Sequence, residues 1–254
     1  MQDGPHFQLT LPAEPFLLAA DIDGTMLGDE AGEAWMRAFR QECASGFLLA
    51  YITGRDFQSV LQLVAEGRLP PPDFIGGDVG SELLDCRDSR NFLGERYAAQ
   101  VGPGWDLEAV YARGVGEGVR RQDFPEGQPR FQAGFDWDGQ LQTLDAFYHR
   151  LANGDGFHIL PSYNQYIDVL PDVLGKGKVV EFLQKELNLA PVRVVVAGDA
   201  GNDREMFDTI YKGILPSNAL QELVTIACQP RHYQSPLPCA RGVIDGLRHF
   251  EFIT

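Results

Sequence analysis

The chain has 254 residues, of which 44% are hydrophobic and 22% charged, and its formal net charge is −15. This composition predicts an ordinary globular protein, either one large domain or a core with an inserted domain. The acidity argues against nucleic acid or an anionic membrane surface as a partner, and no apolar run is long enough to predict a transmembrane helix.

The cysteines show neither the CxxC spacing nor the clustering with histidine that is typical of a zinc site. They are Cys43, Cys86, Cys228 and Cys239. Reduced thiols in a cytoplasmic protein are the favoured interpretation, although Cys228 and Cys239 are able to pair in principle. Residues 1–15 lack the basic and apolar segments of a signal peptide, which also favours the cytoplasm. We expect a monomer or a small homo-oligomer.

Three apolar runs alternate with segments of helical periodicity along the chain. Continuous apolar runs are typical of parallel strands that helices cover on both faces. The expected strands are 16–20, 47–52 and 192–197, and the expected helices are 30–43, 56–66 and 178–187. This alternation predicts a Rossmann-like, doubly wound α/β fold with a mostly parallel sheet. Ligands of such sheets collect beyond the carboxyl ends of the strands.

The middle of the chain has a different pattern. Residues 86–171 begin with glycine-rich and charged segments, followed by short candidate strands within 130–138 and 157–170. An amphipathic helix is expected over 141–153. We therefore expect an α+β domain, 86–171, inserted into a core of 1–85 and 172–254, with hinges near Asp85–Cys86 and Pro171–Asp172.

Four polar segments follow the expected strands or begin the expected helices. They are Asp21-x-Asp23, Thr53-Gly54-Arg55, Lys176, and the GDAGND segment at 198–203. Each alone has a structural explanation, such as a turn, a helix cap or a solvated lysine. Their joint order favours a catalytic site. Asp21, Asp199 and Asp203 are hard oxygen donors of the kind that suits Mg²⁺.

These residue types fit phosphoryl transfer, which depends on positioning and on neutralisation of charge. Asp21 is expected to attack phosphorus and form an aspartyl-phosphate, while Asp23 protonates the leaving group and then deprotonates water. Thr53, with backbone N–H groups near Asp23 and Gly54, is expected to bind phosphoryl oxygens. Lys176 supplies positive charge, whereas Lys178 is expected in the first turn of the following helix.

In order, ADIDGT, ITGR, the Lys176–Gly177 pair and GDAGND resemble the four motifs of the haloacid dehalogenase-like (HAD) phosphatases. The resemblance covers essentially the whole chain, and a cap between the second and third motifs is typical of the type IIB members. The segments at 76–83, 167–183 and 240–250 resemble the sucrose-phosphate phosphatase branch. The resemblance implies that Mg²⁺ is held by Asp21, the Asp23 carbonyl and Asp199, with Asn202 and Asp203 in support.

The cap departs from that branch. A lysine that binds the sugar phosphate in sucrose-phosphate phosphatases, and a serine just after it, correspond here to Gln132 and Gly134. Candidates for contacting phosphate or substrate are Gly54, Arg55, Asn202, Glu82, Gln128, Arg130 and Gln132. Phe131, Tyr163, Asn164 and Gln165 are further candidates for a sugar pocket. The alternative for Phe131, Phe135, Trp137 and Tyr166 is a place in the hydrophobic core of the cap.

The sequence therefore predicts a Mg²⁺-dependent phosphatase that acts on a small phosphorylated sugar or a glycosyl phosphate. A general phosphatase of hexose phosphates or other metabolites is the nearest alternative. A catalytically silent regulatory protein that keeps the HAD fold is the alternative from a different class.

Overall fold

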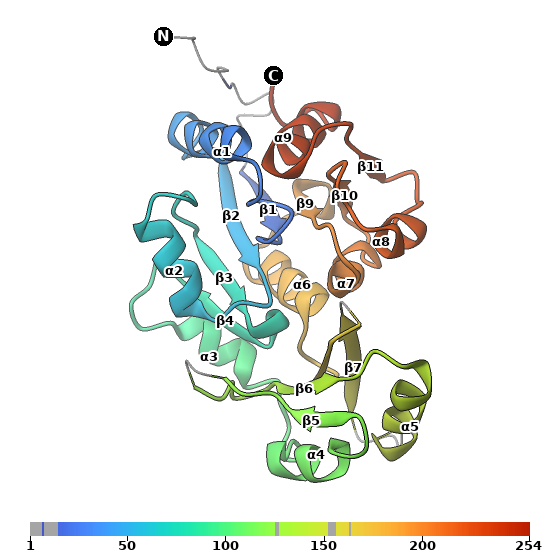
Figure 1. Cartoon of the computed structure of the whole chain (residues 1–254). Coiled ribbons are helices and arrows are strands. Elements are labelled where there is room, and N and C mark those ends of the chain that lie inside the picture. The colour runs from blue at the N-terminus through green and yellow to red at the C-terminus, as the bar shows by residue number, and fades with distance from the viewer. Residues whose placement is uncertain (1–6, 8–14, 125–126, 152–155, 163) are drawn as a thin grey trace.

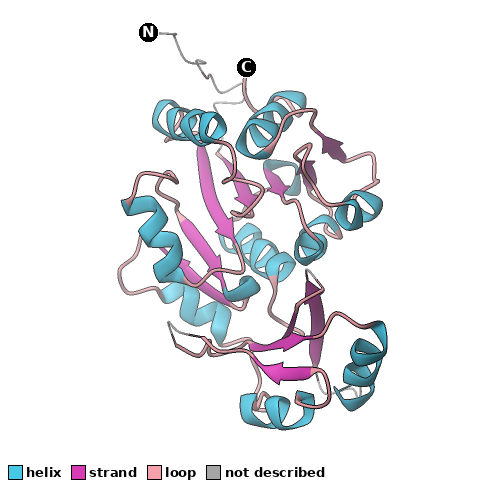
Figure 2. Cartoon of the chain, in the orientation of Figure 1, coloured by secondary structure: helices cyan, strands magenta, loops and turns pink. Residues whose placement is uncertain are grey.

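A computed structural model describes residue 7 and residues 15–124, 127–151, 156–162 and 164–254. It contains two sheets, each with its own helices (Figures 1 and 2). No helix in these ranges is both long and apolar enough to cross a membrane.

The larger sheet has seven strands in the order β11-β10-β9-β1-β2-β3-β4. Its strands are β1 (Phe16–Ala20), β2 (Phe47–Ile52), β3 (Phe74–Gly77), β4 (Glu82–Asp85), β9 (Val194–Ala197), β10 (Lys212–Leu215) and β11 (His232–Gln234). Neighbours are parallel except for β3 and β4, which form an antiparallel pair. The predicted doubly wound α/β sheet is confirmed, with β1 in its interior between β2 and β9.

Helices cover both faces of this sheet (Figure 1). One face packs on α1 (Glu30–Glu42), α2 (Phe57–Ala65) and α9 (Cys239–His249), and the other on α3 (Phe92–Ala98), α6 (Lys176–Glu186), α7 (Arg204–Phe207) and α8 (Gln221–Ile226). Leu17 and Leu18 of β1 point to opposite faces, and both are fully buried. This two-sided burial explains why β1 reads as a continuous apolar run.

Two elements of the core begin two residues away from the predicted start. Residues 191–193 form a short 3₁₀ turn that starts at a proline, so β9 begins at Val194 rather than at residue 192. Helix α6 begins at Lys176 rather than at Lys178, which puts Lys176 in its first turn.

The smaller sheet is antiparallel, in the order β5-β6-β8-β7. It comprises β5 (Val119–Arg121), β6 (Ala133–Trp137), β7 (Phe157–Ser162) and β8 (Tyr166–Pro171). Helices α4 (Leu107–Gly114) and α5 (Leu141–Leu151) cover one face, and the other face is turned toward the core (Figure 1). Phe135 and Trp137 lie in the hydrophobic cluster between this sheet and its helices.

Helix α3 lies within the range that the sequence assigns to the inserted domain, but it packs on the core. Tyr97 is fully buried in the same hydrophobic cluster as Leu17 of β1 and Val179 of α6. Strand β4 runs antiparallel to β3, and α3 follows it on the face of the sheet that also packs on α6. We propose that the inserted domain begins after Val101 and is followed by the core from about Asp172.

Candidate active site

Three carboxylates meet at the carboxyl ends of β1 and β9. The backbone N–H of Asp21 donates to the Ala197 carbonyl (2.9 Å), so the two strands end side by side. Asp21, Asp199 and Asp203 are buried, and they offer carboxylate oxygens that all lie within 4.8 Å of one another. The structure therefore brings together the three acids that the sequence predicts as metal ligands through their side chains.

Lys176 is the cation of this cluster. Its Nζ donates to Asp21 Oδ1 (2.8 Å) and to Asp203 Oδ1 (2.6 Å), and the side chain is completely buried. Burial alone lowers the pKa of Lys176, but the two carboxylates outweigh it and raise that pKa above its ordinary value. Lys178, one half-turn along α6, is exposed. The structure thus selects Lys176 from the two neighbouring lysines.

Asp203 organises the loop that carries Asp199. Its Oδ2 accepts hydrogen bonds from the backbone N–H groups of Asp199 (2.9 Å) and Ala200 (3.1 Å), while its Oδ1 accepts from Lys176. Both oxygens are therefore engaged within the protein. This bonding gives Asp203 the geometry of a support for Asp199 and Lys176.

The turn after β1 holds Asp199 from the other side. The buried Thr25 hydroxyl donates to Asp199 Oδ1 (2.9 Å). Gly24 has a φ of +76°, and a Cβ there would lie 2.3 Å from Asp199 Oδ2. The Gly-Thr pair of the ADIDGT motif therefore allows close approach of the two loops and fixes one metal-ligand candidate.

The cluster carries an excess of negative charge, because three carboxylates face one ammonium group. Burial raises the pKa of Asp21 to about 8, with Lys176 opposing and Asp203 and Asp199 adding to the rise. Burial, together with Asp203, raises the pKa of Asp199 to about 6. Burial and the neighbouring carboxylates thus both disfavour the negative charge here, and a bound cation would compensate for it.

The Asp23 side chain lies outside this cluster of described carboxylates. It is half exposed and forms a two-pronged pair with Arg55, whose Nε and second terminal nitrogen donate to its two oxygens at 2.7 Å each. The remaining terminal nitrogen of Arg55 donates to Ser59 Oγ (3.0 Å). Arg55 thus holds Asp23, whereas the sequence predicts that it contacts phosphate or substrate.

Thr53 and Gly54 of the ITGR motif and Asn202 of the GDAGND motif are the remaining core candidates. Thr53 is buried at the end of β2, and its hydroxyl accepts from the Arg55 backbone N–H (3.2 Å). Gly54 is open, with only a Val79 methyl within 4 Å of the position of a Cβ. Asn202 is half buried, and its Oδ1 has no hydrogen-bond partner among the described residues.

The candidate residues of the cap lie in different places. Glu82 and Arg130 meet at the seam between core and cap, where the Arg130 backbone N–H donates to Glu82 Oε1 (3.2 Å). Gln128 bonds instead to Tyr111 and Arg121 within the cap. Gln132 is buried, and its Nε2 donates to Asp168 Oδ1 (2.6 Å).

The aromatic candidates divide between two cores. Phe135 and Trp137 pack inside the cap, which confirms the alternative of a structural role for them. Phe131 packs in the cluster of the catalytic core, and Tyr166 is half buried. Tyr163 lies outside the described residues, between Ser162 at the end of β7 and Asn164, which has a φ of +50°.

Comparison with known proteins decides the family. The family model of sucrose-6F-phosphate phosphohydrolase matches residues 14–251. The chain belongs to this family. It is 32% identical over 242 residues to a mannosylfructose-phosphate phosphatase of Agrobacterium fabrum, covering 92% of this chain and 96% of that protein.

Two further relatives extend the comparison. The structure of the Synechocystis sucrose-phosphatase, in complex with sucrose and phosphate, is 28% identical, with a TM-score of 0.83 over 94% of this chain and 99% of that one. A glucosylglycerol-phosphate synthase of Pseudomonas anguilliseptica is 31% identical over 93% of this chain, which spans 31% of that protein. The phosphohydrolase family thus matches both the core and the cap of this chain.

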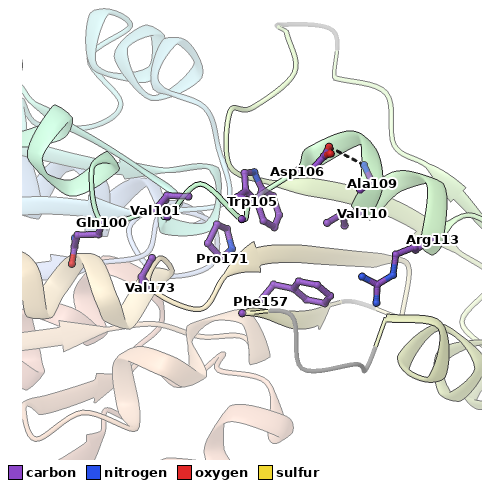
Figure 3. A pocket seen from close by; sticks show the side chains of 13 residues that line it. Gln100, Val101, Trp105, Asp106, Ala109, Val110, Arg113, Phe157, Pro171 and Val173 are labelled. Carbon is purple, nitrogen blue, oxygen red and sulfur yellow. Dashed lines mark hydrogen bonds between the residues drawn. The ribbon is translucent and has the colours of Figure 1, made fainter.

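A cavity of about 420 Å³ in this family member lies away from the carboxylates, at the segments that connect core and cap (Figure 3). Trp105, Phe157, Arg113 and Pro171 are among its lining residues. The Trp105 indole donates to the Arg130 carbonyl (3.4 Å). The cavity thus borders both connections between core and cap.

Sequence reasoning misses two supporting side chains of this phosphohydrolase site. Thr25 ends the ADIDGT motif, which predicts no role for it, although its hydroxyl donates to Asp199 Oδ1. Tyr97 lies in the range assigned to the cap, and its hydroxyl donates to the Gly80 carbonyl (2.9 Å) and accepts from the Gly175 N–H (3.3 Å). Tyr97 therefore ties the loop after β3 to the start of α6, where Lys176 lies.

Proposed function

We propose that this chain is a Mg²⁺-dependent phosphatase that hydrolyses the phosphomonoester of a small sugar or glycosyl compound through an aspartyl-phosphate. The observation that carries the proposal is the buried cluster of Asp21, Asp199 and Asp203 around Lys176 at the end of β1. The single ammonium group balances only one of the three buried carboxylates, and a bound divalent cation would offset the remaining negative charge.

Asp21 and Asp199 are the residues that would hold Mg²⁺, since each keeps a carboxylate oxygen that no described hydrogen bond occupies. When bound, the ion would neutralise the carboxylates and the phosphate oxygens. Asp203 acts indirectly, through Lys176 and the loop of Asp199. Asp23 would contribute its backbone carbonyl rather than its carboxylate, which is engaged by Arg55.

In the first step, a carboxylate oxygen of Asp21 forms a bond to phosphorus as the bond between phosphorus and the sugar oxygen breaks. Asp23 gives its proton to that oxygen, which requires it to leave Arg55. In the second step, Asp23 takes a proton from water, the water oxygen bonds to phosphorus, and the bond to Asp21 breaks. Lys176 and the Thr53 hydroxyl hold the phosphoryl group in both steps.

The relatives named above support a phosphorylated glycosyl compound as the substrate. The four cysteines form no disulfide in the structure, which agrees with a cytoplasmic setting. The test is phosphate release from acetyl phosphate and from a panel of sugar phosphates, with Mg²⁺ or with EDTA. The panel includes sucrose 6-phosphate, mannosylfructose phosphate, glucosylglycerol phosphate, trehalose 6-phosphate and glucose 6-phosphate.

Asp21→Asn should abolish release, and Asp208→Asn, which changes an exposed ion pair with Arg204, should leave it intact. No Mg²⁺-dependent turnover of any phosphate would favour the silent regulatory protein. Equal turnover of all sugar phosphates would favour a general phosphatase.

A further inference from the structure

Helix α6 begins with Lys176 and has no side-chain cap of its own. Its N-cap residue, Gly175, carries no side chain and has a φ of +142°. The first N–H groups of a helix need acceptors from elsewhere. Glu205 of α7 supplies one, because its Oε2 accepts a hydrogen bond from the Gly177 N–H (3.3 Å). A carboxylate is also favoured at this positive end of the α6 dipole. Glu205 therefore caps, from a neighbouring helix, the helix that carries Lys176.

The backbone on either side of Lys176 lies close to Glu205. A Cβ at Gly175 would lie 2.3 Å from Glu205 Oε2, and a Cβ at Gly177 would lie 2.6 Å from the Glu205 backbone carbonyl oxygen. Both distances are shorter than van der Waals contact allows, so two glycines are needed to admit Glu205. The Lys176 Nζ lies 2.8 Å from Asp21 Oδ1. A shift of Glu205 would therefore move the start of α6, and with it Lys176, relative to the expected nucleophile.

The other oxygen of Glu205 faces the cap. Ile159 of β7 packs with the cap helices, so the preceding residue, His158, lies on the face of the sheet that is turned toward the core (Figure 1). The His158 Nδ1 lies 3.5 Å from Glu205 Oε1. The His158 Nε2 is buried and has no hydrogen-bond partner among the described residues. Strand β7 also contacts residues 201–203 of the GDAGND segment. One carboxylate thus contacts both the docked cap and the start of α6.

We propose that Glu205 is a positioning residue for Lys176 and that His158 couples the docking of the cap to this position. The two oxygens of Glu205 divide the task, because Oε2 holds α6 and Oε1 meets the cap. A cap that moved away would take His158 with it, and Glu205 would lose one of the two contacts that hold it. Lys176 is then best placed when the cap is docked. This inference rests on the proposed function and adds a link between the cap and the charge that stabilises the phosphoryl group.

The test measures kcat and KM with the best glycosyl phosphate of the panel for Glu205→Ala, His158→Ala and the double variant. Glu205→Ala should lower kcat about tenfold or more and change KM by less than about threefold, because Lys176 acts on charge in the transition state. Glu205→Gln keeps an oxygen for the Gly177 N–H and should lose clearly less kcat than Glu205→Ala.

The double variant tests the coupling. His158→Ala alone should lower kcat about threefold, and it should have no further effect once Glu205 is alanine, since both changes act through one carboxylate. Asp208→Ala, which removes an exposed carboxylate at the end of α7, is the control for Glu205. His149→Ala, which removes an exposed histidine of α5, is the control for His158. Both controls should keep the kcat of the wild type.

Thermal melts separate positioning from a purely structural role. A lower Tm in Glu205→Ala, with an unchanged kcat for the folded enzyme, would overturn the proposal. A loss of kcat in Glu205→Gln as large as in Glu205→Ala would contradict the capping of α6. Effects of the two single changes that multiply in the double variant would overturn the coupling to the cap. A lack of turnover of every phosphate by the wild type would instead reject the proposed function itself.

Discussion

Replacing Lys176 with methionine should destabilise the fold and abolish turnover, while the same change at Lys178 should do neither. Methionine keeps the unbranched shape of lysine but removes the ammonium group that lies 2.8 Å from Asp21 and 2.6 Å from Asp203. The cluster then has three buried carboxylates and no cation. Lys178 is exposed on the same helix, so Lys178→Met controls for the loss of charge and for helix propensity.

The size of the effect follows from the burial of the pair. Removing one partner of a buried ion pair costs about 3–5 kcal/mol, which corresponds to a fall of about 10 °C in Tm for a chain of this length. Because the pKa of Lys176 is raised, its contribution is fully present below its ordinary pKa and is lost only in alkali. Binding of protons by the carboxylates would reduce this loss of unfolding free energy, since burial already raises the pKa of Asp21 to about 8.

The assay is urea unfolding in EDTA, followed by tryptophan fluorescence, at about pH 6 and about pH 9. The loss in Lys176→Met should be larger at the higher pH, where keeping a proton on the buried Asp21 carboxylate costs more free energy, and Mg²⁺ should reduce it. An unfolding free energy equal to that of Lys178→Met at both pH values would refute this account of the cluster.

Three further predictions concern the neighbours of this cluster. Asp168→Asn should gain stability relative to the wild type, by up to about 3 kcal/mol, as pH rises from about 4 to about 7. Burial raises the pKa of Asp168 to about 6, so ionisation of this carboxyl group in the wild type opposes folding. Urea titrations that show a constant difference in unfolding free energy across this range would contradict the prediction. Arg55→Ala should change Tm little, since the Arg55–Asp23 pair is partly exposed. It should lower kcat about tenfold or more for sugar phosphates and less for p-nitrophenyl phosphate, whose leaving group needs no proton. Equal losses on both substrates would mean that Arg55 binds phosphate. Thr25→Val should weaken Mg²⁺ binding in calorimetry by about tenfold, because a hydrogen bond to Asp199 is lost, and Thr25→Ser should restore it.

The core of the fold is predictable because its signals are local. The apolar run 16–20 is long enough for a strand and too short for a helix, and acids follow it where a parallel sheet gathers its ligands. The convergence of Asp21, Asp199 and Asp203 follows once β1 and β9 are neighbours. Lys176 is harder, since only tertiary packing distinguishes a buried first-turn lysine from the exposed Lys178.

The cap and its boundary are less predictable for physical reasons. Helix α3 is short, and only the burial of Tyr97 reveals that it belongs with the core. Asp23 and Arg55 lie 32 positions apart, and their pairing depends on how two loops approach. Gly134 lies so close to Phe124 and Gln122 that a Cβ would overlap both, and no spacing in the sequence encodes this approach.

The most direct test of the central claim is to capture phosphate on Asp21. The enzyme is mixed with Mg²⁺ and the best sugar phosphate of the panel, quenched in acid within one turnover, digested, and examined by mass spectrometry. The account predicts one phosphoryl group on the peptide that carries Asp21, and none in Asp21→Asn. Full turnover by Asp21→Asn, or a phosphoryl group on any other residue, would contradict it.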